Sequence, residues 1–157
     1  MSRQTLLIAL ALGTGLVAVA APGFAEMQGG GADGQATEGF MAEADIRAAL
    51  GGQAIDGHYR NGRTFSESYA ADGRISYRDD YRASGGRWSL VNGAFCTIYD
   101  GDPSGGCFRV RRSGANCFEF YFVARTEEEA KAPRKPDWTA RGWRSDAKST
   151  CVDGANA

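Results

Sequence analysis

The chain has 157 residues, of which 18 are Lys or Arg and 19 are Asp or Glu, so its formal net charge is −1. This balance argues against a nucleic-acid-binding protein, because that class concentrates basic residues on one face. The length suits one small domain rather than two.

The first 25 residues have the composition of a cleaved secretory signal. Arg3 supplies a positive charge, an apolar run covers 6–21, and small residues at 21–25 suit a signal peptidase. The apolar run is too short and too rich in Ala and Gly for a membrane span, which needs about 20 strongly apolar residues. We therefore expect a periplasmic or secreted protein whose mature chain has no membrane span.

The next segment, 26–37, is Gly-rich, polar and aperiodic, which predicts a disordered spacer. A single domain is expected to follow over 38–157. It should begin with a short helix, because apolar residues recur at helical spacing from Ala42 to Leu50. Gly51 and Gly52 then supply a stop signal.

From Gln53 onward the period changes from helical to two, which is the pattern of half-buried strands. Turn pairs such as Asn61-Gly62 and Asp72-Gly73 recur at short intervals and favour tight hairpins. Strands this close together can only be joined as hairpins, so we expect an antiparallel meander. The predicted strands are 54–59, 64–70, 75–81, 87–91, 94–99, 107–112 and 117–123, with one turn at 84–86.

The end of the chain adds a charged turn or helical piece at 126–131 and a final apolar segment at 138–143. Seven or eight short strands with one helix predict a mainly β domain, either a small barrel or a strongly curled sheet.

All four cysteines lie in the part of the chain that would be exported. An even number in an oxidising compartment predicts two disulfides, for which three connectivities are possible. We favour Cys96–Cys107, which would join the arms of one hairpin, and Cys117–Cys151, which would tie the C-terminal tail to a strand. A metal or redox site is the alternative, but the chain has no Cys-x-x-Cys and its only histidine, His58, is far away in sequence.

Aromatic residues that share strand faces allow two interpretations. They could line a cavity for a small apolar ligand, as in barrels that hold one molecule. They could equally form the core, and we favour the core because a domain of this size needs its large apolar residues inside. The same alternation puts Tyr81 on the face of Tyr77. The aromatic residues that could line the cavity or form the core are Tyr69, Tyr77, Trp88, Phe118, Phe120 and Phe122.

The segment 100–106 is predicted to be a seven-residue hairpin loop. Its acidic and hydroxyl residues match the first ligand positions of a calcium loop, but Arg111 stands where the bidentate Glu is needed. An interaction or inhibitor module would use the same loop together with exposed rim arginines, Arg109 and Arg111, to bind a cell-envelope protein. The candidate calcium ligands are Asp100, Asp102 and Ser104.

No catalytic constellation is readable in the sequence. His58 lies in a predicted strand near no obvious nucleophile, so it does not meet the geometric needs of a general base. Glu67 shares a face with Phe65 and Tyr69, an apolar setting that would raise the pKa of its carboxyl. One such carboxyl is not a mechanism, so we expect no enzyme and no cofactor.

A set of short motifs carries a family resemblance. It consists of Glu67-Ser-Tyr69 followed by Asp72-Gly73, then Gly86-Arg87-Trp88, Asn92-Gly93, Cys96 and Cys107-Phe108. Over residues 42–123 the chain resembles small exported bacterial proteins grouped as a domain of unknown function of the 995 type. The resemblance implies a periplasmic or secreted β-rich domain and brings no activity and no catalytic residue. We expect a non-enzymatic small-ligand-binding domain or, alternatively, a protein-interaction or inhibitor module.

Overall fold

The computed structural model describes residues 39–152, except for the side chains of 102–104. These residues belong to one compact unit that spans 32–157. The predicted leader at 1–25 and the predicted spacer at 26–37 lie outside the described residues.

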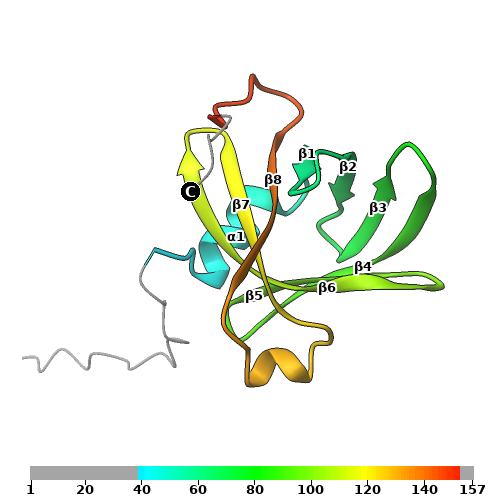
Figure 1. The fold of residues 1–157 in the computed structure, drawn as a ribbon, viewed down its shortest axis with the longest axis vertical. Coiled ribbons are helices and arrows are strands. Elements are labelled where there is room, and N and C mark those ends of the chain that lie inside the picture. Colours follow the sequence, from blue (N-terminus) through cyan, green and yellow to red (C-terminus); the bar gives the residue numbers. More distant parts are fainter. Residues whose placement is uncertain (1–38, 153–157) are drawn as a thin grey trace, which may run out of the picture. The chain divides into compact units, whose positions relative to one another are not determined.

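Eight antiparallel strands close into a barrel, in which each strand pairs with the next and β1 pairs with β8 (Figure 1). The meander, the closed barrel and the single helix confirm the predicted fold class. The 138–143 segment is the eighth strand. In chain order the elements are α1 (Glu43–Leu50), β1 (Ala54–Tyr59), β2 (Thr64–Tyr69), β3 (Arg74–Arg78), β4 (Ala83–Val91), β5 (Ala94–Tyr99), β6 (Asp102–Gly114), β7 (Cys117–Ala124), η1 (Glu129–Lys131) and β8 (Asp137–Arg144).

Helix α1 packs at the end of the barrel where β1 begins. Ile46 and Leu50, on its predicted apolar stripe, are fully buried and belong to the same core cluster as Trp88 and Phe95. The backbone N–H of Gly52 donates to the carbonyl oxygen of Tyr69, which ties the helix end to the end of β2. The other end of the barrel, where β1 ends and β8 begins, has no such cover among the described residues.

Inward-facing aromatic side chains fill the barrel. Tyr69 and Phe95 meet edge to face with their ring centroids 5.0 Å apart, and Phe95 lies 6.2 Å from Phe120. An eight-stranded barrel is just wide enough for its own side chains, so rings of this size leave little room inside. The largest buried core residues are Phe65, Tyr69, Tyr77, Trp88, Phe95, Tyr99, Phe118 and Phe120.

A second, smaller cluster lies outside the barrel wall. It is built on the Cys96–Cys107 disulfide, which joins neighbouring strands and packs with Val123 and Ala130. The segment around η1 crosses this face and is fixed there, because Ser89 Oγ donates a 2.6 Å hydrogen bond to Glu127. The second disulfide joins Cys117 to Cys151. Both favoured disulfide pairings are therefore confirmed.

The turn predicted at 84–86 is wrong, because β4 begins at Ala83 and runs through it. Gly86 is needed there for close approach rather than for a turn, since an added Cβ would lie 2.2 Å from the carbonyl oxygen of Ile98. The real turn follows Asp79, whose carboxylate accepts the backbone N–H groups of Tyr81 and Arg82. Tyr81 therefore leaves the strand and is 78% exposed, contrary to its predicted place on the face of Tyr77.

The predicted hairpin loop at 100–106 is also wrong, because β6 begins at Asp102 and only 100–101 remain as a turn. Its rim arginines differ from expectation as well. Arg109 is only 8% exposed, since β6 is an interior strand between β5 and β7 and its guanidinium packs against Gly93. Arg111 is half-buried between the rings of Phe40 and Tyr121.

Candidate functional site

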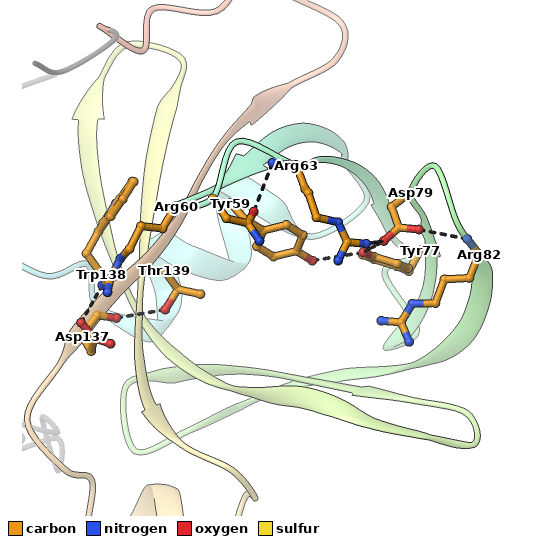
Figure 2. A pocket seen from close by; sticks show the side chains of 10 residues that line it. Tyr59, Arg60, Arg63, Tyr77, Asp79, Arg82, Asp137, Trp138 and Thr139 are labelled. Atoms are coloured by element: carbon orange, nitrogen blue, oxygen red, sulfur yellow. Dashed lines mark hydrogen bonds and ion pairs between the residues drawn. The ribbon is translucent and has the colours of Figure 1, made fainter.

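The open end of the barrel carries two adjoining hollows, which we call the mouth. The larger one, the Arg63 lobe, has a volume of about 860 Å³ (Figure 2). The smaller one, the Phe122 lobe, has a volume of about 280 Å³. They are contiguous, because Tyr59, Asp137 and Thr139 line both. The Arg63 lobe is also lined by Arg60, Asn61, Arg63, Tyr77, Asp79, Arg82 and Trp138, and the Phe122 lobe by Thr97, Tyr99, Phe108, Phe122, Arg125 and Arg134.

A chain of hydrogen bonds forms the floor of the Arg63 lobe. The hydroxyl of Tyr59 donates to that of Tyr77 over 3.2 Å, and Tyr77 donates to Asp79 Oδ2 over 2.8 Å. Arg63 Nη2 reaches the same carboxylate oxygen at 2.7 Å, as Figure 2 shows. Backbone N–H groups, that of Tyr81 foremost, lower the pKa of Asp79, so this carboxylate stays ionised and anchors Arg63.

The two tyrosines of the floor act as neutral hydrogen-bonding groups. Burial raises the pKa of Tyr59, and the hydrogen bond with Tyr77 adds to the effect. The pKa of Tyr77 is also raised, chiefly by burial. Both hydroxyls therefore keep their protons at neutral pH. Each proton is already donated within the chain, by Tyr59 to Tyr77 and by Tyr77 to Asp79, so toward a ligand these hydroxyl oxygens act as hydrogen-bond acceptors.

Below the mouth, the barrel interior holds a void of only about 40 Å³. The carboxyl of Glu67 lies there and accepts hydrogen bonds from the hydroxyls of Tyr69 and Tyr99. Burial raises the pKa of Glu67, as its apolar strand face predicts, although the two hydroxyls oppose the shift. A void of this size has room for a water molecule or two, but not for an organic ligand.

The Phe122 lobe connects solvent with this interior. Phe108 and Phe122 are half-buried and meet edge to face at 5.7 Å. Tyr59, Thr97 and Tyr99 line both the lobe and the void beneath it. The lobe is thus a hollow with aromatic walls and polar groups at its edge, between the barrel wall and the segment that follows β7.

Arginines outnumber carboxylates among the described residues of the mouth. Five arginines but only two aspartates stand among the described residues that line the two lobes. All five guanidinium groups lie over aromatic rings, an arrangement that holds the planar cation in place. The pairs are Arg60 on Trp138 at 5.6 Å, Arg63 on Tyr81 at 4.6 Å, Arg82 on Tyr77 at 5.1 Å, and Arg125 and Arg134 on Phe122 at 5.1 and 4.3 Å.

The structure divides the six aromatic residues that the sequence singles out. Tyr69, Trp88, Phe118 and Phe120 are core residues. Tyr77 is in the core and also lines the Arg63 lobe, whereas Phe122 is half-buried and lines the Phe122 lobe. Sequence reasoning missed the arginines, Tyr59 and Trp138. A usable signal was present, because these residues flank turns, and every second turn of a meander lies at the same end of the barrel.

The calcium prediction concerns side chains that are largely outside the described set. Asp102 and Ser104 lie in β6, and only their backbone is described, whereas Asp100 is exposed in the preceding turn. Among the side chains that the structure does describe, no cluster of three or more His, Cys, Asp or Glu residues could hold a metal ion. His58 is half-buried, with its ring 6.1 Å from that of Trp143.

Comparison with known proteins finds no matching family model, no matching curated protein and no matching solved structure. Within residues 39–152, no helix has the length and apolar character needed to cross a membrane. What this chain can do must therefore be inferred from the geometry and charge of the mouth.

Proposed function

We propose that this protein is a non-enzymatic, exported barrel that binds one small ligand at its mouth. One observation carries the proposal, namely the contrast between a filled interior and an open hollow of about 860 Å³ at one end. Small-molecule sites in proteins are concave, have volumes of roughly 300–1,000 Å³, and combine aromatic walls with a few fixed polar groups. The mouth has all three properties.

The polar groups of the mouth favour binding over catalysis. Asp79 is held by Arg63, by Tyr77 and by two backbone N–H groups, so it has little freedom to exchange a proton with a ligand. Glu67 lies beneath the mouth, engaged by two tyrosine hydroxyls. Neither carboxyl has a second titratable carboxyl as a partner in its hydrogen bonds, so the mouth lacks the carboxyl pair that glycoside hydrolysis uses.

Export is part of the proposal and has separate support. Two disulfides in a domain of this size are typical of proteins that function in an oxidising compartment. The leader-like composition of 1–25 and the resemblance to exported bacterial domains point the same way.

The test is native mass spectrometry of the mature protein, isolated without reduction from its own cell envelope. We expect a companion mass of a few hundred daltons on the chain. Trp138→Ala should remove it, because Trp138 lines the Arg63 lobe. Trp143→Ala is the matched control, since it lies on the same strand outside both lobes.

Two other results would count against a ligand at the mouth. If Trp138→Ala and Trp143→Ala retain the companion equally, the ligand does not sit there. If the chain carries a second protein in place of a small molecule, the interaction or inhibitor alternative replaces the proposal, and residues 100–106 become its first candidate contact.

A further inference from the structure

We propose that the ligand of the mouth is an amphipathic organic anion, whose apolar body occupies the Phe122 lobe and whose anionic group is bound by Arg134. This inference rests on the proposed function and specifies the chemical class of its ligand. It is drawn from the placement of one guanidinium group, from the local charge, and from the apolar lining of the lobe.

Arg134 contacts an aromatic ring but forms no ion pair with a described carboxylate, unlike Arg60 and Arg63 of the Arg63 lobe. Arg60 and Arg63 form ion pairs with Asp137 and Asp79 at 2.6 and 2.7 Å. Within the described part of the chain, no carboxylate lies within ion-pair distance of Arg134. Its guanidinium carbon instead lies 4.3 Å from the ring centroid of Phe122.

This stacking leaves Arg134 suited to an anion. A contact between the guanidinium carbon and a ring does not use the N–H donors, so those without a partner can bind a carboxylate, sulfonate or phosphate. The backbone is fixed as well, because the N–H of Arg134 donates to the carbonyl oxygen of Val123 over 3.0 Å. The cation is thus placed at the rim of the lobe before any ligand arrives.

The charge around the lobe supports the same ligand class. The whole chain has a net charge of −1, yet among the described side chains that line the mouth arginines outnumber aspartates by five to two, and Arg134 has no carboxylate among them within ion-pair distance. The ratio of arginines to carboxylates is therefore higher at this end than in the chain as a whole. A concave site in which one sign of charge is in excess attracts ligands of the opposite sign.

The lobe itself accepts the apolar body. Phe108 and Phe122 form its walls, and the hollow narrows toward the void above Glu67. Its volume of about 280 Å³ lies near the lower end of small-molecule sites, which suits a body of two or three linked aromatic rings or a short alkyl chain. An anion with such a body would bury its apolar part on the rings while its charged end remained at the solvent-exposed rim beside Arg134.

Two fluorescent probes with one shared body test the inference. Anilinonaphthalene sulfonate carries the anionic group, and phenylnaphthylamine is the same body without it. In titrations of the folded, oxidised chain, we expect the sulfonate to bind roughly tenfold more tightly, the effect of one hydrogen-bonded ion pair in a partly exposed site. Phe122→Ala should weaken both probes.

Arg134→Gln should reduce sulfonate affinity by roughly three- to tenfold and leave the neutral probe unchanged. Arg74→Gln is the matched control. Arg74 is also exposed, but it pairs with Asp72 and lies outside both lobes. It should therefore alter neither affinity.

The outcomes separate the inference from the function on which it rests. Equal binding of both probes, unaffected by Arg134→Gln but weakened by Phe122→Ala, would overturn the anionic class and leave the ligand-binding mouth in place. Failure of both probes to bind the folded chain would overturn the proposed site together with its ligand class.

Discussion

The buried carboxyl of Glu67 predicts that stability falls as pH rises. Glu67 is 6% exposed, and burial raises the pKa of its carboxyl above the ordinary value of 4.5. Because the folded protein then binds more protons than the unfolded chain, the stabilising effect of the neutral carboxyl is fully present below about pH 4.5. It is lost as pH rises from there through the folded-state pKa. Within that window, one proton of difference lowers the free energy of unfolding by about 1.4 kcal/mol per pH unit.

Glu67→Gln tests this directly, because glutamine has the same shape and does not ionise. We expect wild-type stability, measured by urea unfolding from pH 4.5 to 8, to fall along that slope until the folded-state pKa of Glu67 is passed, and then to level off. The variant should lack that component of the slope. Its free energy of unfolding should therefore rise relative to that of wild type as pH increases. Glu128→Gln, which alters an exposed carboxylate, serves as the control and should retain the wild-type slope.

Two neighbours refine the Glu67 prediction. The hydroxyl of Tyr99 lowers the Glu67 pKa by hydrogen bonding. In Tyr99→Phe the Glu67 pKa should therefore be higher still, and the pH range over which stability falls should extend to higher pH. The contribution of Asp79 to stability depends on pH in the opposite direction. Its pKa is lowered from 3.8, so this contribution is lost only as pH falls below that value. The two effects therefore occupy different pH ranges. Parallel stability curves for wild type and Glu67→Gln would refute the reasoning.

Three further changes have expected outcomes in denaturant unfolding. Phe120→Ala should lower the free energy of unfolding by about 3–5 kcal/mol, because Phe120 is in the core. Phe122→Ala should lower it clearly less, because Phe122 is half-buried. Equal losses of stability would contradict the assignment of Phe120 to the core and Phe122 to the mouth. Replacing Cys117 and Cys151 by serine should cost about 4 kcal/mol by loop entropy over a separation of 34 residues, and an unchanged urea midpoint would count against that account. Gly57→Ala should cost about 1–3 kcal/mol, since a Cβ would lie 2.4 Å from a carbonyl oxygen of β8; a neutral effect would mean that the strands can separate there.

Local sequence signals predicted the meander well, because its strands are joined by short turns. Pairs such as Asn61-Gly62 and Asp72-Gly73 do connect neighbouring strands, and the Cys96–Cys107 pairing follows from one hairpin. Closure of the barrel could not be predicted in the same way. It depends on the pairing of β8 with β1, and no local sequence pattern identifies these two segments as partners.

The errors arose where tertiary contacts override a local pattern. Gly86 belongs to a turn-like sequence, yet its missing side chain allows β4 to approach the backbone at Ile98. Arg109 follows the spacing of a solvent-facing residue, yet the loop at Gly93 covers it. Sequence reasoning has no direct access to such coverage, because it depends on segments that are distant along the chain.

The candidate site was predicted least well, although its chemistry was readable in part. Arg63, Arg82 and Arg134 belong to three different turns, and only the alternation of a meander brings them to one end. That alternation follows from the predicted topology. The volume of the hollow does not, because it depends on how the rings of the core divide the space inside the barrel.

The pairing of β1 with β8 also dictates the order in which the chain can fold. The two strands are nearly the length of the domain apart, and contacts of such high sequence separation form late because loop closure costs entropy first. A chain that emerges with its N-terminus first cannot complete the barrel before β8 has emerged. The Cys96–Cys107 hairpin can oxidise before that moment, whereas Cys151 follows β8 and can pair with Cys117 only after it. The second disulfide is therefore formed only when every strand is available, and it closes the tail onto a barrel that can already be whole.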